Sequence, residues 1–518
     1  MKSLLENLLR DNRCVILFLC VAAFMSYAFM LSGSFKTIDD PALIIHNPDL
    51  QSFAHVGKIF STPLFEGGAY YRPLLVFYYM MVYHLFGPNP FFFNLVNLLL
   101  HIGVAVSIFF LVRGILQSRE VGFLTSLLFV LHPLHWEVVC MNLTDTILCA
   151  FFYINAFYFF WRYNETKAPF YYYLFSLVLF SLALLSKENA IVLLLLMVAS
   201  YILFSARRLS FREGAALFIR RVAPFLIVLL FYVLLRQVLG ITHIFYWPSF
   251  KASMLAFVML FKLMLTNIWL TIMPIGLHFY RIERIFQDFN IEVLGIVGLF
   301  FVLFILFIKN RKILGAPVIF FFLWFLIGLL PFSQVIPIGV QPGYVSMAER
   351  QMYISSVGIF VLLVLLAKSF CHWMMCRKMV SKKILAQATA GWFLFLLLTT
   401  MSQSVLASNK ITVYRQSLAH NPDNIRIWYA LGLEYANRRS FVYAEQEFRK
   451  MLVFDPQDVR ARIALGKALC DQGRYLEGID EYEKIHNAGE LSVLLADNLQ
   501  KANALRNSRV FQNKSQTK

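Results

Sequence analysis

The chain has 518 residues, of which 59% are hydrophobic and 15% are charged, and its formal net charge is +18 at pH 7. A mean hydropathy of +0.65 excludes an ordinary soluble globular protein, in which roughly half of the residues are apolar and about a quarter are charged. The composition instead predicts a polytopic membrane protein. The seven cysteines do not have the spacing of a disulfide framework.

Apolar runs along the chain predict eleven membrane spans, because each is long enough to cross about 30 Å of hydrocarbon. The first run follows MKSLLENLLRDNR and has no small-residue cleavage site, which predicts an uncleaved span rather than a signal peptide. A twelfth run, 254–273, carries Lys262 and Asn267 near its middle. We expect this run to be re-entrant or interfacial on the outer face. The eleven spans are predicted near 14–33, 92–113, 121–139, 141–161, 169–186, 189–206, 218–238, 291–308, 314–332, 352–370 and 384–406.

Basic residues indicate the orientation, since Lys and Arg are retained on the cytoplasmic side of a membrane. With the N-terminus inside and 254–273 not crossing, the cytoplasmic flanks hold 20 Lys and Arg residues against 5 Asp and Glu. If 254–273 crossed, the basic clusters at 309–312 and 368–383 would lie outside instead. The positive charge is therefore interpreted as a topology signal, and no nucleic-acid partner is predicted. The first loop, the loops after spans three, five, seven and nine, and the C-terminal region then share one compartment.

After residue 406 the sequence becomes polar and shows a 34-residue period, in which Leu431-Gly432 recurs as Leu465-Gly466. Small and aromatic residues at fixed offsets are typical of stacked antiparallel helix pairs, and this pattern resembles tetratricopeptide repeats. Such arrays bind peptides or partner proteins; the alternative is a purely structural cap on the last span. We predict a membrane domain at 1–406 and a repeat domain at 407–505, with a half repeat at 409–420, repeats at 421–454 and 455–488, a capping helix at 490–505 and a disordered tail at 506–518.

Polar side chains gather in the loops of the shared compartment, where they are costly next to a membrane unless they are used or paired. Asp39 and Asp40 precede Pro41, so one of them is expected to cap a helix that begins there. The apolar segment Pro73–Phe86 is too short to cross and is expected to lie along the interface. The candidate site residues are Asp39, Asp40, Arg72, His132, His135, Glu137, Asp145, Lys187, Glu188, Glu349 and Arg350.

His132, His135 and Glu137 have a spacing that metal ligands use, but Pro133 breaks the helix that would align them. No metal site is therefore predicted, and a divalent cation is left as an alternative.

The charged candidates have structural alternatives as well. Lys187 and Glu188 could pair only with each other, and Arg350 could hold Glu349 or another acid. A helix cap would account for one of the two adjacent aspartates but not for both.

Five motifs occur in a fixed order: DDPALIIHNP, YRPL with LFGPNPFFFNLVNLLLH, HPLHWE, SKENA and MAERQMYISSVG. Together with the repeats they resemble the transmembrane-and-tetratricopeptide O-mannosyltransferases and their bacterial relatives, which have the type C glycosyltransferase (GT-C) fold. The chain departs from that pattern in two places. It has Ile38-Asp39-Asp40 where many relatives have Trp-Asp-Asp, and it has NLTD, with Asp145 eight residues after Glu137, where relatives often carry Gly-Arg-x-Asp ten residues after the Glu.

The resemblance implies an all-α GT-C membrane fold followed by an α-solenoid, and transfer of a sugar from a polyprenyl-phosphate carrier by a metal-independent or weakly metal-dependent inverting displacement. The family's acidic pair maps onto Asp39 and Asp40, and we favour Asp40 as the base that takes the proton of the acceptor hydroxyl. Arg350, with Lys187 and Arg72 behind it, is expected to stabilise the phosphate leaving group. The remaining candidates, His132, His135, Glu137, Asp145, Glu188 and Glu349, are expected to support the site.

The expected reaction is transfer of a mannose-like hexose to protein Ser or Thr, with the polyprenyl-phosphate sugar, a protein or peptide acceptor held by the repeats, and membrane lipid as partners. Alternatives are transfer to a lipid or cell-envelope glycan, a transporter or flippase, and a membrane-tethered scaffold. A transporter would place charges within its spans and would contain paired broken helices, whereas the charges here gather at one face. The short repeat array and the absence of a retention signal in NKSQTK favour a bacterial inner membrane, with repeats in the periplasm, over the endoplasmic reticulum.

Overall fold

The computed structural model of the chain describes residues 9–36, 39–65, 68, 70–166, 168–205, 211–241, 249–284, 286, 288, 290–310, 314–332, 344–346, 349–487 and 489–516. Residues 1–8 and the basic pair 311–312, on which the predicted topology partly depends, lie outside these ranges, as do residues 517–518 of the predicted tail.

The chain divides into two compact units. The membrane unit consists of Met1–Leu277 and Ile282–Ser408, and the repeat unit consists of His278–Arg281 and Asn409–Lys518. The boundary near residue 408 follows the change from an apolar to a polar sequence.

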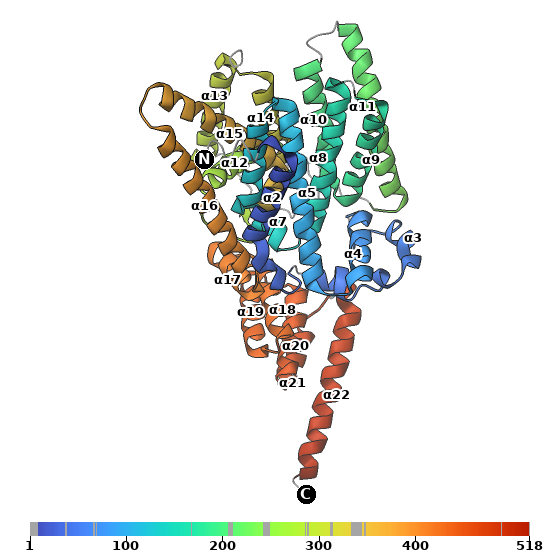
Figure 1. Cartoon of the computed structure of the whole chain (residues 1–518). Helices are drawn as coiled ribbons and strands as arrows, with labels where there is room; N and C mark the ends of the chain where they lie inside the picture. The colour runs from blue at the N-terminus through green and yellow to red at the C-terminus, as the bar shows by residue number, and fades with distance from the viewer. Residues whose placement is uncertain are drawn as a thin grey trace. The chain divides into compact units, whose positions relative to one another are not determined.

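The membrane unit is built from helices, because a backbone in lipid must satisfy its polar groups within its own segment. Figure 1 shows them as bundled ribbons, and the expected fold class, an all-α membrane protein, is confirmed. Its α-helices are α2 (Asn12–Tyr27), α3 (Val56–Ile59), α4 (Pro73–Phe86), α5 (Pro90–Leu116), α6 (Arg119–Leu131), α7 (Trp136–Cys140), α8 (Thr144–Glu165), α9 (Phe170–Ser186), α10 (Leu193–Ser200), α11 (Phe211–Val238), α12 (Phe250–Ile272), α13 (Ile291–Asn310), α14 (Ala316–Leu329), α15 (Met352–Cys376) and α16 (Lys382–Leu406).

Short helical turns and one pair of strands connect these helices. Strands β1 (Ile282–Arg284) and β2 (Tyr344–Ser346) pair antiparallel. The turns are η1 (Ala28–Ser32), η2 (Pro41–Ile45), η3 (Pro48–Gln51), η4 (Phe53–His55), η5 (Pro133–His135), η6 (Glu188–Val192), η7 (Tyr201–Ser205), η9 (Leu330–Phe332) and η10 (Glu349–Gln351).

Among the described residues, six helices are long and apolar enough to cross a membrane, or seven if one bent pair counts as a span. Eleven spans therefore stay a prediction. Several predicted runs form apolar helices of 10–17 residues, including Phe170–Ser186 and Ala316–Phe332. The run predicted at 121–139 is not one straight span, because α6 ends at Leu131 and the chain bends by 54° before Pro133–Cys140. His132 caps the new turn, and its ring accepts a hydrogen bond from the backbone N–H of Leu134.

Close packing of α14 on α15 brings the end of α14 next to the start of α15. A Cβ on Gly328 would lie 2.5 Å from Ser355 Oγ, and one on Gly358 would lie 2.3 Å from the carbonyl oxygen of Phe321. Only glycine allows this approach, as small residues commonly do between membrane helices. The contact places η9, at the end of α14, near η10, at the start of α15.

The repeat unit consists of paired helices (Figure 1), and one side-chain contact recurs between them. A Cβ on Gly432 would lie 2.4 Å from the ring of Phe448, and one on Gly466, 34 residues later, would lie 2.5 Å from the ring of Tyr482. The last helix continues to Gln516, so residues 506–516 are helical and not disordered as predicted. The helices are α17 (Lys410–His420), α18 (Ile425–Asn437), α19 (Phe441–Phe454), α20 (Val459–Asp471), α21 (Tyr475–Glu483) and α22 (Ser492–Gln516), with the turn η11 (Gly489–Leu491) before α22.

A segment between α12 and α13, His278–Arg281, forms part of the repeat unit. Ser417 Oγ donates a hydrogen bond of 2.8 Å to the carbonyl oxygen of Phe279, and the amide of Asn421 lies 3.0 Å from Nε2 of His278. No motif or period in the sequence indicates that this loop belongs with the repeats.

Candidate functional site

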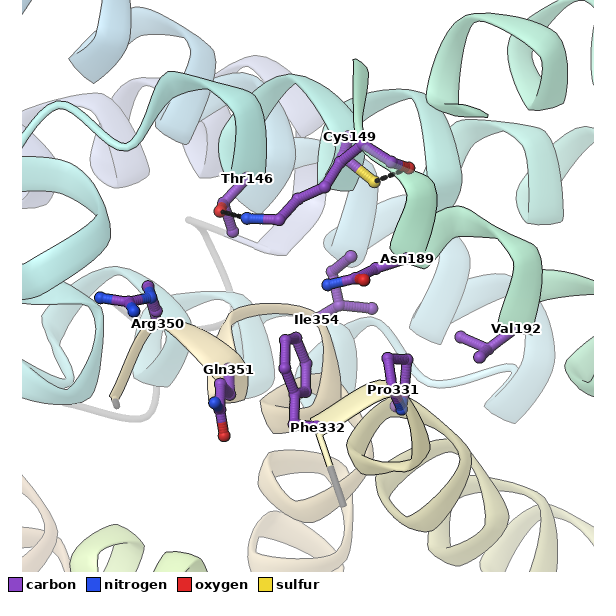
Figure 2. Close-up of a pocket in the computed structure, with 11 residues that line it drawn as sticks. Thr146, Cys149, Asn189, Val192, Pro331, Phe332, Arg350, Gln351 and Ile354 are labelled. Atoms are coloured by element: carbon purple, nitrogen blue, oxygen red, sulfur yellow. Dashed lines mark hydrogen bonds between the residues drawn. The ribbon is translucent and has the colours of Figure 1, made fainter. Parts of the chain in front are cut away.

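A cavity lies where the start of α8, the end of α9, the end of α14 and the start of α15 meet (Figure 2). It contains about 470 Å³ of unfilled space, part of it open to solvent. Its polar lining is Thr146, Lys187, Asn189, Arg350 and Gln351. The apolar part of the lining is Cys149, Val192, Gly328, Pro331, Phe332 and Ile354.

Four charged residues beside the cavity form one network. Arg72 donates to Asp145 Oδ2 from Nη1 at 2.6 Å, and to Glu188 from Nε at 3.0 Å and from Nη2 at 2.5 Å. Lys187 Nζ lies 2.9 Å from Asp145 Oδ2 and donates to Thr146 Oγ1 at 2.7 Å. Two cations and two carboxylates balance each other, which allows them to be buried together.

Arg72 is held by this network and by the Tyr70 ring, whose centroid lies 4.5 Å from its guanidinium carbon. Burial alone would lower the pKa of its guanidinium, but the negative charges of Glu188 and Asp145 outweigh burial, and the pKa is raised above its ordinary value. Arg72 is not among the residues that line the cavity. Its position therefore fits a role in fixing the two carboxylates better than the predicted contact with a donor phosphate.

Lys187 and Glu188 do not pair with each other, which was one alternative from the sequence. Lys187 has an extended backbone, with φ −161° and ψ 133°, and neighbouring side chains on extended backbone point to opposite sides. Lys187 consequently reaches Asp145 while Glu188 reaches Arg72.

Arg350 pairs with Glu137, which is 0% exposed. Its Nη1 donates to Glu137 Oε1 at 2.7 Å, and its backbone N–H donates to Oε2 at 2.9 Å. The structure therefore agrees with the alternative in which Arg350 holds an acid other than Glu349. Arg350 nevertheless lines the cavity, so it can hold Glu137 and face a ligand at the same time. Glu349 is buried beside it in η10.

His132 and His135 are buried away from the cavity, and each uses both ring nitrogens. His132 Nε2 lies 3.0 Å from the carbonyl oxygen of Thr271. His135 contacts the carbonyl oxygen of Phe129 at 2.8 Å and Ser356 Oγ at 3.0 Å. These contacts assign both histidines to helix packing. Within the described ranges, no group of three His, Cys, Asp or Glu side chains is placed to hold a metal ion.

Asp39 and Asp40 differ in their surroundings. Asp39 is exposed, whereas Asp40 is 1% exposed and accepts a hydrogen bond of 2.6 Å from the backbone N–H of Lys36. A helical turn does begin at Pro41, but the Asp40 side chain makes no capping hydrogen bond to it. Tyr79 lies within electrostatic reach of both Asp40 and Asp145. Tyr79 therefore lies between Asp40 and the charge network, to which the same loop also contributes Arg72.

Sequence reasoning missed three polar residues of the cavity: Thr146, Asn189 and Gln351. Thr146 and Gln351 directly follow the charged candidates Asp145 and Arg350, and Asn189 directly follows Glu188. Position next to a charged residue is therefore the available signal, since a neutral side chain in these loops has no charge that marks it as a candidate.

These helices and this buried set of paired charges define an integral membrane protein with a polar site among apolar helices. Residues 71–217, which include Arg72, Asp145 and Lys187, match the family described as dolichyl-phosphate-mannose-protein mannosyltransferase. The chain is similar to protein O-mannosyl-transferases of the TMTC type, over this region and over longer stretches.

The relatives differ in how much of the chain they cover. Human protein O-mannosyl-transferase TMTC1 is 31% identical over 194 residues, which is 33% of this chain and 21% of the relative. Human TMTC4 is 26% identical over 482 residues, covering 80% of this chain and 63% of the relative. Human TMTC3 is 25% identical over 486 residues, covering 86% and 52%. The matched region is therefore less than two thirds of each relative's length.

Among solved structures, an oligosaccharyltransferase from Archaeoglobus fulgidus, tethered to an acceptor peptide, matches with a TM-score of 0.42 and 12% identity, over 84% of this chain and 58% of that one.

Proposed function

We propose that this protein is a GT-C glycosyltransferase that transfers a mannose-like hexose from a polyprenyl-phosphate carrier to a Ser or Thr hydroxyl of a protein, on the extracytoplasmic face of the membrane. The observation that carries the proposal is the cavity in which Lys187 and Arg350 face a common space beside an apolar wall. Similarity to protein O-mannosyl-transferases supports the same reaction class.

The cavity suits a lipid-linked phosphate because it combines charge with apolar surface. Lys187 and Arg350 are each partly neutralised by a buried carboxylate, Asp145 and Glu137 respectively. A phosphate that binds between them gains charge-assisted hydrogen bonds, and these strengthen as the phosphate leaves with the electron pair of its bond to the sugar. The apolar side chains, among them Phe332, would contact the first part of the carrier chain.

In the proposed displacement, the acceptor oxygen attacks the anomeric carbon from the side opposite the phosphate. The carbon–oxygen bond to the phosphate breaks as the new bond forms, which inverts the configuration. Asp40 takes the proton of the acceptor hydroxyl. The hydrogen bond from Lys36 N–H holds one oxygen of this carboxyl group in place.

The protein acceptor and the compartment are also part of this proposal. Helix pairs of the kind found in the repeat unit commonly bind extended chains, so we assign acceptor selection to that unit. The charge distribution of the loops favours a site on the extracytoplasmic face, and the short repeat array favours a bacterial inner membrane, in which that face is periplasmic.

The test uses the purified full-length protein in lipid nanodiscs, a polyprenyl-phosphate mannose donor and Ser/Thr-containing peptides. We expect peptides that gain one hexose, and we expect Lys187→Gln to lower transfer by about 10²-fold or more. Lys251→Gln is the control, because Lys251 pairs with Asp288 away from the cavity and its loss should leave transfer unchanged. If Lys187→Gln transferred the sugar as fast as the parent protein, the cavity would not be the donor site. Transfer with and without a chelator will determine whether a divalent cation is required.

A further inference from the structure

Asn189 is a polar residue of the cavity whose side chain has no role in holding the fold. It belongs to η6 and lines the cavity together with Lys187 and Arg350. Within the described part of the chain, its amide makes no hydrogen bond to another residue. Figure 2 shows the amide extending into the space between Thr146, Arg350 and Pro331.

In contrast, the charged side chains of the two residues before Asn189 are held by other protein groups. Lys187 is held by Asp145 and Thr146, and Glu188 is held by Arg72. In a 3-10 helix, successive side chains are rotated by about a third of a turn, so Asn189 points away from the network that Glu188 joins. The local backbone thus directs the two charges to the network and the neutral amide to the cavity.

The chemistry of an amide differs from that of the two cations beside it. Lys and Arg only donate hydrogen bonds, which suits a phosphate, whereas an Asn amide both donates and accepts. A hydroxyl group also donates and accepts, and it carries no charge. An amide placed next to two cations therefore suits a hydroxyl that is attached to a phosphate-bearing group. Polar side chains without a protein partner in a binding cavity commonly find one in the ligand.

We propose that Asn189 is a specificity residue whose amide hydrogen-bonds one hydroxyl of the donor's sugar ring, while Lys187 and Arg350 hold the phosphate. This inference rests on the proposed function of the same cavity. It means that the enzyme distinguishes sugars by one hydroxyl position, since a donor that lacks this hydroxyl leaves the amide without a partner in the closed complex.

The test compares full-length parent protein and Asn189→Leu with polyprenyl-phosphate mannose and with a series of donors that each lack one ring hydroxyl. For the parent protein we expect one deoxy donor to lose about tenfold or more in kcat/KM. For Asn189→Leu we expect the complete donor to fall to about the same level, with no further loss for that deoxy donor. Thermal stability should be unchanged, because the amide has no internal hydrogen bond to lose.

Asn155→Leu is the matched control. Asn155 lies in α8, where its amide hydrogen-bonds Ser107 Oγ and the carbonyl oxygen of Phe151, each at 2.8 Å. Its loss should lower stability without changing the preference among donors. If Asn189→Leu kept the parent's preference at every hydroxyl position while Lys187→Gln lost transfer, the role of Asn189 would be wrong and the proposed function would stand. If the parent protein transferred no sugar from any polyprenyl-phosphate donor, the proposed function would itself be wrong.

Discussion

Asp145 connects the charged residues of the site, because its carboxylate accepts hydrogen bonds from Arg72 and from the N–H of Thr146 and forms an ion pair with Lys187. An isolated charge in this position would be strongly unfavourable, so each member depends on the others. Lys187 is consequently held at the cavity wall before any ligand binds. A binding group that is fixed in advance loses less conformational entropy when the ligand arrives.

Replacement of the two first-loop aspartates tests their separate roles. We expect Asp40→Asn to lower sugar transfer by about 10²-fold or more, because the amide keeps the shape of the carboxylate but does not take a proton. Asp39→Asn should lose less, since Asp39 is exposed and Asp40 is the buried member of the pair. Transfer rates of the two purified variants with a polyprenyl-phosphate mannose donor would measure this.

Donor binding is the companion measurement, because both variants should still bind the donor as the parent does. Near-normal turnover by both variants would make the aspartate pair structural. A larger loss in Asp39→Asn than in Asp40→Asn would exchange the two roles.

Sequence reasoning selected the charged residues of the site but not their partners. Asp39, Lys187 and Arg350 stood out because charge beside an apolar run is unusual. The partners were not predictable, since the Arg72–Asp145 pair joins residues 73 positions apart and the Arg350–Glu137 pair joins residues 213 positions apart. Such pairs depend on how helices pack, which periodicity does not specify.

At the scale of elements, the repeat helices show what a periodic sequence can predict. Helices α18 to α21 lie within the predicted ranges 421–454 and 455–488, since two antiparallel helices need small and large residues at fixed offsets. The length of α22 was not predictable in the same way, because residues 506–516 have no apolar period and their helix depends on continuation from residue 505.

The Gly432–Phe448 contact gives a test of this packing. In Gly432→Ala the new Cβ would lie 2.4 Å from the Phe448 ring, so the ring must move. Overpacking costs about 1–3 kcal/mol, while alanine gains about 1 kcal/mol in helix propensity. We expect a net loss of stability, seen as faster amide hydrogen exchange in α18 and α19.

Two further variants separate packing from propensity. Gly391→Ala in α16 introduces a Cβ that meets nothing within 4 Å, so exchange in α16 should slow or stay the same. Adding Phe448→Leu to Gly432→Ala should recover part of the lost protection. Unchanged exchange in Gly432→Ala alone would show that the ring is not a rigid part of the repeat.

At the scale of the whole molecule, helix α12 decides which loops share a side of the membrane. Its first turn is joined to the residues before α13 by the Lys251–Asp288 ion pair, and its last turn to the end of α6 by the His132–Thr271 contact. Two cavity residues show which end of the bundle this is: Thr146 lies in the first turn of α8, and Lys187 directly follows the end of α9. If α6, α8, α9 and each later helix except α12 cross once, both ends of α12 face the side that carries the cavity.

Cysteine labelling in the full-length chain, with the native cysteines replaced by serine, tests this topology. We expect Leu239→Cys before α12 and Ile275→Cys after it to react with a membrane-impermeant thiol reagent from the same side, in intact spheroplasts. Lys467→Cys, exposed on α20, should react from that side too, because the repeat unit includes His278–Arg281, which closely follow α12 in the chain. Lys382→Cys, at the start of α16, is the control and should react only after the membrane is opened.

Labelling of positions 239 and 275 from opposite sides would mean that α12 crosses. The basic residues at 368–383 would then have to lie outside, against the retention of Lys and Arg on the cytoplasmic face. In that case the cavity and the repeats would be separated by the membrane, and the repeat unit could not select acceptors for the site.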